Sequence, residues 1–444
     1  MNKQLEIILD NYANEMVTKL QDLIKIKSIV DFDSSTKDAP FGPGPKQALD
    51  YALALAETKG FETVNFDNRA AEIIYGDADE SIGAALHLDI VPEGKSWDFP
   101  PYSGIIHDGK IYGRGSTDNK GPFIATLYAC LAIKESNLPI SKKIRMIVGT
   151  CEEIGSFPCI DYYLSKTKAP ECGIVPDARF PAIFAEKGFL TFKIIKQLRQ
   201  NSNSSFVLKS IEGGEAPNVV PSSATAVFID KNDMTEKTVY GYGKTAHAST
   251  PHLGENAILN LFNNLLNDAE ISNELRTEVT ALSKCFSDIY GSGMDISFED
   301  FSGKLTLNLG TVTYNNGQLE ILSNIRFPIT FGVDDLRKKI IDKLDELDAQ
   351  YKEISYMKHF YMDKESDLMK KLIDIYRKET GDTENLPIAH GAGSYARVLD
   401  GFVPFGPLFP KDPILFHMEN EALKIEKLLK LSKIYAETLY QLAK

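Results

Sequence analysis

Several short apolar runs in this chain end in side chains that can bind a metal ion, and this pattern constrains the fold more than any other feature. The runs span residues 84–88, 144–148, 173–176 and 414–416, and the side chains at or just after their ends are His87, Asp89, Glu152, Glu153, Asp177 and His417. Ligands in open α/β sheets gather at the carboxyl ends of strands. The runs therefore predict strands whose ends share one site.

Glu152 and Glu153 are adjacent at the end of one such run. A buried pair of acids is costly unless a positive charge lies between the side chains. The pair therefore indicates a metal site with a separate proton acceptor. The alternative is a solvated turn, because exposed acids need no partner. The recurrence of acids and histidines at other run ends favours the metal site.

A glycine-rich segment at residues 112–122 leads into a helical pattern. Pro122 opens a stretch with apolar residues four apart, which is typical of a helix with proline in its first turn. Asp118 would then lie at the mouth of that helix. A nucleotide-binding G-x-G-x-x-G loop is the alternative, but Asp118 takes the place of the third glycine, and its carboxylate would repel a pyrophosphate.

Composition excludes several partners. The 444 residues include 49 basic and 62 acidic side chains, which give a net charge of −13. Basic side chains do not cluster with aromatic ones, so a nucleic acid partner is not expected. The sequence contains no signal-like apolar segment and no membrane-length run, so no membrane partner is expected. Five cysteines without C-x-x-C spacing favour free thiols and a cytoplasmic location.

The order of the elements predicts the fold class. Residues 1–185 alternate helix-like and strand-like segments, which predicts a sheet flanked by helices. After residue 187, strands and turns alternate, and Asn315-Asn316-Gly317 has the composition of a hairpin turn. The expected strands span 190–195, 224–229, 305–312 and 321–327, and the expected helices span 5–23, 368–376 and 422–442.

The position of His417 predicts the domain organisation. It follows the strand-rich middle segment, whereas the other candidate ligands precede it, so the middle segment must be an insertion. We expect an α/β fold with a discontinuous catalytic domain at 1–186 and 361–444, built on a mixed sheet flanked by helices. An α+β lid domain is expected at 187–360.

Six segments together resemble a known enzyme family. They are His87-Leu-Asp89 and residues 113–122, 151–156, 175–177, 243–251 and 393–397. In this order they resemble the PepV-type dinuclear metallodipeptidases. That family belongs to the group of co-catalytic zinc peptidases that contains aminoacylase, carnosinase and succinyl-diaminopimelate desuccinylase. The resemblance covers nearly the whole chain.

The resemblance implies two divalent metal ions. His87 and Asp177 would bind the first, Glu153 and His417 the second, and Asp118 would bridge both. Nitrogen and oxygen ligands without thiolate suit Zn²⁺, Mn²⁺ or Co²⁺. Two dications carry four positive charges against three carboxylates, so a bridging hydroxide would neutralise the remainder.

The family pattern also implies two supporting carboxylates. Glu152 would act as general base and then as general acid. Asp89 would orient the ring of His87 and raise its basicity. His390 is not expected to bind metal, because the family does not use this position.

Further family positions lie in the expected lid and in a late loop. His247 would stabilise the oxyanion formed during hydrolysis. Arg326 would bind the free carboxylate of a short peptide, and Asn218 would lie near that carboxylate. Ser394 would belong to a loop that lines the substrate pocket, where many relatives have glycine in place of Ala392.

These resemblances imply hydrolysis of the peptide bond in dipeptides with a free N-terminus, by metal-activated hydroxide. An N-acyl amino acid or succinyl-diaminopimelate amidohydrolase is the enzymatic alternative. A non-catalytic metal-dependent binding protein is a third possibility, but it would not need Glu152. The expected lid is long enough to resemble the double-sized lid of PepV, so we expect a functional monomer.

Overall fold

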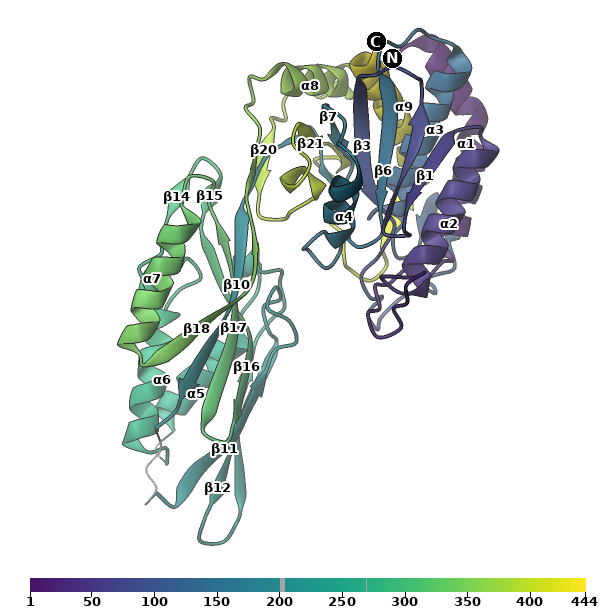
Figure 1. Ribbon diagram of the computed structural model, residues 1–444. Helices are drawn as coiled ribbons and strands as arrows, with labels where there is room; N and C mark the ends of the chain where they lie inside the picture. Colours follow the sequence, from purple (N-terminus) through teal and green to yellow (C-terminus); the bar gives the residue numbers. More distant parts are fainter. Residues whose placement is uncertain (200–203, 269) are drawn as a thin grey trace. The chain divides into compact units, whose positions relative to one another are not determined.

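The computed structural model describes residues 1–199, 204–268 and 270–444 and divides into two compact units (Figure 1). The first unit comprises Met1–Phe184, Met362–Ile388 and Gly393–Lys444, and the second comprises Ala185–Tyr361 and Ala389–Ala392. The chain passes from the first unit to the second after Phe184 and returns to the first after Tyr361. The short return at 389–392 has no sign in the sequence pattern.

A mixed six-stranded sheet forms the centre of the first unit. Its strand order is β1 (Glu62–Phe66), β2 (Ala70–Tyr75), β6 (Lys143–Gly149), β3 (Ser81–His87), β7 (Cys172–Val175) and β21 (Phe402–Pro404). The strands β6, β3, β7 and β21 run parallel to one another, whereas β2 pairs antiparallel with both β1 and β6. The predicted mixed sheet is therefore confirmed, with the parallel strands running from β6 to the edge strand β21.

Helices flank this sheet, as expected. They are α1 (Lys3–Ile24), α2 (Pro43–Thr58), α3 (Lys120–Ser136), α4 (Pro158–Lys166), α8 (Asp367–Thr380) and α9 (Ile425–Ala443). Helices α3 and α9 pack on β3, and α1 packs on both helices. Nearly every side chain of α3 is buried. Burial of each large apolar side chain contributes about 1.5–3 kcal/mol, so α3 holds the layers together.

Two expectations for the late part of the chain are wrong. The final helix begins at Ile425 rather than Ala422, because Ala422–Lys424 form β23, which pairs with β5 (Lys110–Tyr112) and leaves no helical hydrogen bonds for these residues. The run at 414–416 is not a strand: Ile414 is 58% exposed and lies in an irregular loop. Pro413, which has no N–H to donate, disfavours strand pairing there.

The second unit contains a seven-stranded antiparallel sheet. Its order is β13 (Glu236–Tyr242), β12 (Ser223–Asp230), β11 (Phe206–Gly213), β16 (Thr306–Asn315), β17 (Gln318–Phe327), β10 (Gly188–Gln197) and β18 (Ala349–Met357). The predicted hairpin is confirmed, since β16 pairs with β17 across Asn316 and Gly317, with φ values of 49° and 87°. Positive φ at both positions is the requirement of a two-residue hairpin turn.

Helices bury the apolar face of this second sheet. They are α5 (Ala257–Asn267), α6 (Asn273–Cys285) and α7 (Val333–Glu346). One hydrophobic core joins their buried residues to those of the strands. The unit is thus α+β, as expected, and rests on its own core.

Short elements complete the description. They are β4 (Ile105–His107), β8 (Ala178–Arg179), β9 (Ile183–Glu186), β14 (Glu299–Asp300), β15 (Gly303–Lys304), β19 (Phe360–Tyr361), β20 (Ile388–His390) and β22 (Pro407–Leu408), with single 3₁₀ turns at Pro251–Leu253, Ser292–Met294 and Tyr395–Arg397.

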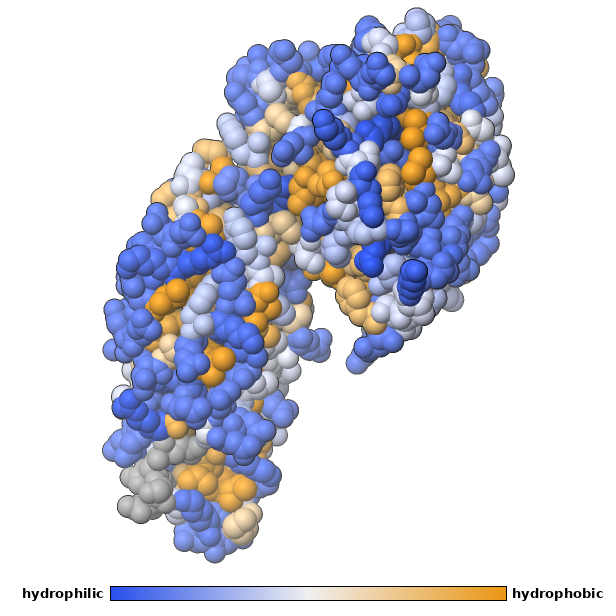
Figure 2. Space-filling view, viewed as in Figure 1, coloured by the Kyte–Doolittle hydropathy of each residue, from blue (hydrophilic) through white to orange (hydrophobic). Residues whose placement is uncertain are grey.

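The surface of the face shown in Figure 2 is mainly hydrophilic, with small scattered apolar areas. Within the described ranges, no helix combines the length and the apolar character needed to cross a membrane.

Candidate metal centre

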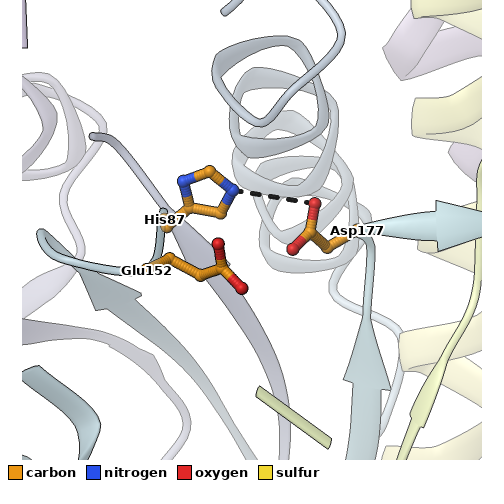
Figure 3. Close-up of side chains that lie close together, drawn as sticks. All are labelled: His87, Glu152 and Asp177. Atoms are coloured by element: carbon orange, nitrogen blue, oxygen red, sulfur yellow. Dashed lines mark ion pairs between the residues drawn. The ribbon is translucent and has the colours of Figure 1, made fainter. Parts of the chain in front are cut away.

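Three adjacent parallel strands bring candidate residues to one edge of the sheet. Strand β3 ends at His87, the chain leaving β6 reaches Glu152 and Glu153 within a few residues, and the chain leaving β7 reaches Asp177. Because β3 lies between β6 and β7 and all three run in the same direction, their carboxyl ends meet. Figure 3 shows the carboxylates of Glu152 and Asp177 approaching the His87 ring.

Asp118 lies between two histidines. The Nε2 atom of His87 lies 3.0 Å from Oδ1 of Asp118 and 3.6 Å from Oδ1 of Asp177. The Nε2 atom of His417 lies 3.3 Å from Oδ2 of Asp118 and 2.9 Å from Oε2 of Glu153. Each oxygen of Asp118 therefore faces a different histidine, which is the geometry that a bridging carboxylate requires. All five candidate ligands are brought together.

The residues fit a pair of divalent cations. Two ligands that each bind a tetrahedral Zn²⁺ at about 2.0–2.1 Å lie roughly 3.3 Å apart. The separations of 2.9–3.6 Å given above match this spacing. In addition, Oε1 of Glu153 is buried without a hydrogen-bond partner. A cation would satisfy that oxygen.

The pKa values of the candidate ligands are shifted in the directions expected for a buried site with an excess of negative charge. Burial raises the pKa of Asp177 to about 7 and also raises the pKa of Glu153. Burial opposes ionisation of Asp118 too, but the hydrogen-bonded imidazoles of His417 and His87 outweigh it and lower the pKa of Asp118. The charge of Glu153 is the main cause that raises the pKa of His417 to about 12. A site of this kind binds positive charge strongly.

His87 presents one particular nitrogen to this cluster. Its Nδ1 atom lies 3.0 Å from the backbone oxygen of Asp89, and a carbonyl oxygen can only accept, so Nδ1 carries the proton. In the neutral ring, Nε2 then has its lone pair directed at Asp118 and Asp177. Burial opposes a charge on His87, yet Asp177 and Asp118 raise its pKa well above the ordinary value.

Asp89 contacts the site through both its side chain and its backbone. Its carboxylate is 3.5 Å from Nδ1 of His87, farther than its own backbone oxygen. The Oδ2 atom instead accepts the backbone N–H groups of Glu152, at 2.8 Å, and Glu153, at 3.0 Å. Asp89 thus fixes the turn that carries both glutamates, while its backbone orients the histidine.

Glu152 lies in the same cluster without an ion pair to either histidine. Its carboxylate, Nε2 or Nδ1 of His87 and a carboxylate oxygen of Asp177 lie within 4.8 Å of one another. Burial, and then the charge of Asp177, raises the pKa of Glu152 well above its ordinary value. By position it could bind a cation or accept a proton, and its role as general base stays a prediction.

Two residues near the ligands were missed in the sequence analysis. Asn119 donates from Nδ2 to the backbone oxygen of Pro176, at 2.6 Å, and to Oδ1 of Asp177, at 3.1 Å. Its position next to Asp118 could have identified it. Glu421 is fully buried and accepts hydrogen bonds from the backbone that carries Asp118. No pattern in the sequence around Glu421 indicates such contacts.

Within the second unit, Asn218 and His247 lie on adjoining backbone segments. The N–H of Ala248 donates to the backbone oxygen of Asn218 at 2.9 Å. The N–H of Ser249 donates to Nδ1 of His247 at 3.2 Å. Because a backbone N–H can only donate, Nδ1 accepts, and the neutral ring of His247 carries its proton on Nε2.

Arg326 belongs to the same region of the second unit. Residue Thr306, its register partner across β16 and β17, donates to the backbone oxygen of Ala248. The guanidinium of Arg326 donates to Oδ1 of Asn324 at 3.0 Å and to the backbone oxygen of Gly391 at 3.3 Å. These bonds orient the group before any ligand is present.

The remaining candidates have different surroundings. Ser394, in the first unit, is 1% exposed, and its Oγ accepts the N–H of Ala396 at the start of a 3₁₀ turn. That Ser394 lines a substrate pocket stays a prediction. His390 lies 3.3 Å from Oε1 of Glu186, in the second unit. The assignment of His390 as a non-ligand also stays a prediction.

Comparisons with known proteins agree on one family. The model of the family described as "Peptidase family M20/M25/M40" matches residues 83–441. The chain is 35% identical to the protein named "Putative dipeptidase YtjP" of Bacillus subtilis, and the match covers 100% of both chains. The fold is similar to human carnosine dipeptidase 1, with a TM-score of 0.66, 13% identity and coverage of 99% and 98%.

A second solved structure has the same fold. It is the YXEP protein of Bacillus subtilis, described as a dinuclear metal-binding peptidase from the M20 family. The TM-score is 0.57 at 9% identity, and the match covers 98% of this chain and 99% of that chain.

Metal binding should stabilise the fold through the ligand cluster. Adding Zn²⁺ or Mn²⁺ to chelator-treated protein at 100 times the dissociation constant should contribute about 2.7 kcal/mol. The unfolding temperature, followed by calorimetry, should therefore rise. Asp118→Asn keeps the shape but removes the shared charge, and should abolish most of this rise. Asp161→Asn, at an exposed position on α4, is the control and should retain it. Equal metal-induced stabilisation in both variants would contradict the assignment of Asp118.

Proposed function

The chain belongs to peptidase family M20/M25/M40, and on that basis we propose that it is a metal-dependent dipeptidase acting on dipeptides with a free N-terminus. One observation carries the proposal. The two oxygens of Asp118 face His87 and His417, at 3.0 and 3.3 Å, with the carboxylate of Glu152 in the same cluster. The name of the Bacillus subtilis relative supports the same activity.

Two divalent ions, Zn²⁺ or Mn²⁺, would complete the site. His87 and Asp177 would hold one, Glu153 and His417 the other, and Asp118 would lie between them. Such ions lower the pKa of bound water and polarise the scissile carbonyl. The ligands contain no thiolate, which agrees with these metals.

Glu152 would move the proton. It is 7% exposed and has no hydrogen-bonded cation, so its carboxylate can accept a proton from the attacking water and return it to the leaving amine. Its position is fixed because Asp89 accepts the N–H of Glu152. Positioning of this kind is what keeps a proton transfer short in the transition state.

The second unit would act as a lid that recognises the substrate. Arg326 would bind the C-terminal carboxylate of the dipeptide, with Asn218 close to it. His247 would donate from Nε2 to the oxyanion, and the N–H of Ser249 on Nδ1 supports this ring assignment. Ser394 would contribute to the pocket from the first unit.

The setting of the enzyme is also part of the proposal. All five cysteines are free, which supports a cytoplasmic location. The lid unit extends from Ala185 to Tyr361, and a lid of this length, similar to the double-sized lid of PepV, supports a monomer that needs no second chain. Sedimentation analysis should find a monomer at working concentrations, whereas an obligate dimer would contradict this part.

Glu152→Gln tests the proposed base. The amide cannot accept a proton, so kcat for a dipeptide such as Leu-Leu should fall by about 10²–10⁴-fold. Metal content, measured by atomic emission, should stay at two ions per chain, because the assigned ligands are intact. Near-normal turnover with both ions present would remove Glu152 from the mechanism.

Substrate choice separates the proposal from the amidohydrolase alternative. Release of free amino acid should be fast with Leu-Leu and slow with N-acetyl-leucine and N-succinyl-diaminopimelate. A preference for either N-acylated compound would contradict the dipeptidase assignment while leaving the metal centre intact.

The role of Arg326 is tested by comparing two substrates, with and without a C-terminal carboxylate, in wild type and in a variant. Charge-assisted hydrogen bonds contribute about 1.5–3 kcal/mol, so Arg326→Met should lower kcat/KM for Leu-Leu roughly 10- to 100-fold. Leu-Leu-amide should be equally poor with wild type and variant, because it lacks the carboxylate. If the substitution weakens both substrates by the same factor, Arg326 does not read the C-terminus.

A further inference from the structure

A buried carboxylate holds the backbone around Asp118. Glu421 is fully buried, and its Oε1 accepts the N–H groups of Thr117, at 2.7 Å, and Asp118, at 3.1 Å. Its Oε2 accepts the N–H of Gly115 at 2.9 Å. Three backbone donors of one tight loop thus converge on a single side chain. Gly115, which has a φ of +86°, has no side chain of its own to hold this loop.

Arg114 connects this carboxylate to two other loops. Its Nη1 donates to Oε2 of Glu421 and to the backbone oxygen of Met418, both at 2.9 Å. Its Nη2 donates to the backbone oxygen of Pro92 at 3.2 Å. Met418 follows the candidate ligand His417, and Pro92 lies on the loop that leaves β3 after Asp89. The guanidinium is 2% exposed, so solvent does not compete for these bonds.

We propose that Arg114 and Glu421 are positioning residues that hold the loops of Asp118 and His417 at the separation needed to bind the second cation. His417 lies on an irregular loop and its side chain is 48% exposed, so local packing fixes it less than it fixes His87. Arg114 donates to the backbone oxygen of Met418, which directly follows His417 in the sequence. The inference rests on the proposed function, since it concerns the same metal centre.

The alternative is that the pair only stabilises the fold. A second buried pair in the same unit, Arg145 with Glu72, provides the comparison. Arg145 also contacts Tyr163 and Ser81, and among the described residues neither side chain of the pair hydrogen-bonds to a candidate ligand. Loss of either pair leaves a buried charge without its partner, so both should destabilise the protein. Only loss of the Arg114–Glu421 pair should alter metal binding.

Titration with Co²⁺ tests the proposal. Glu421→Gln keeps the shape of the side chain, but its amide NH₂ is a donor and replaces one of the two oxygens that accept the three backbone N–H groups. We expect the Co²⁺ beside His417 to bind about 10- to 100-fold more weakly, as for other partners behind metal ligands, and the other Co²⁺ to lose affinity by a smaller factor because Asp118 is shared. The absorption bands of the weakened ion should also change. Hydrogen exchange at Gly115, Thr117 and Asp118, measured without metal, should become faster.

Arg114→Lys is the second variant, because it keeps the charge but cannot span Glu421, Met418 and Pro92 together. It should also weaken the Co²⁺ beside His417 more than the other Co²⁺, because the bond to the backbone of Met418 is lost. Glu72→Gln is the control and should lower the unfolding temperature without changing Co²⁺ affinity or spectrum. Unchanged Co²⁺ binding in Glu421→Gln, or an equal loss in Glu72→Gln, would overturn the proposal. Wild-type dipeptidase activity, assayed in parallel, shows separately whether the proposed function holds.

Discussion

Repulsion among buried carboxylates is the constraint on which the rest of the site depends. Four carboxylates gather at one edge of a single sheet: those of Asp118, Glu152, Glu153 and Asp177. Burial is the largest factor that raises the pKa of Glu152, Glu153 and Asp177. The positive groups that pair with members of this set are imidazoles rather than fixed charges. Such a cluster is stable when cations lie among the oxygens, and that same electrostatic demand is what would make the centre reactive.

The surroundings of the cluster serve to hold it in place. Asp89 accepts two N–H groups of the turn that carries the adjacent glutamates, and Asn119 donates to Asp177. Glu421 accepts three N–H groups of the loop that carries Asp118. Each contact uses a buried side chain to fix the backbone beneath a ligand. Precise placement of ligands in this way is the usual contribution of groups behind a metal site.

The sequence predicts the parts of the fold that periodicity and strand order determine. His87, the two adjacent glutamates and Asp177 could be assigned to one edge because parallel neighbouring strands place their carboxyl ends together. The hairpin at Asn316 could be assigned because its turn requires residues that accept positive φ. In both cases, local chemistry is sufficient.

The rest depends on contacts between distant segments, which a single sequence does not display. The sequence pattern predicts His417 at the end of a strand, but its loop is irregular, and Arg114 holds it through the backbone oxygen of Met418. Residues Ala422–Lys424 form β23 and pair with β5 instead of beginning the final helix. The sequence around Glu421 does not indicate its contacts, because its hydrogen-bond partners are backbone N–H groups about 300 positions earlier in the chain.

Anomalous diffraction from crystals grown with Zn²⁺, recorded on both sides of the zinc absorption edge, would test the central claim most directly. The account predicts two peaks roughly 3.5–4 Å apart, one beside His87 and Asp177 and the other beside Glu153 and His417, with Asp118 between them. A single peak, or peaks remote from Asp118, would contradict it.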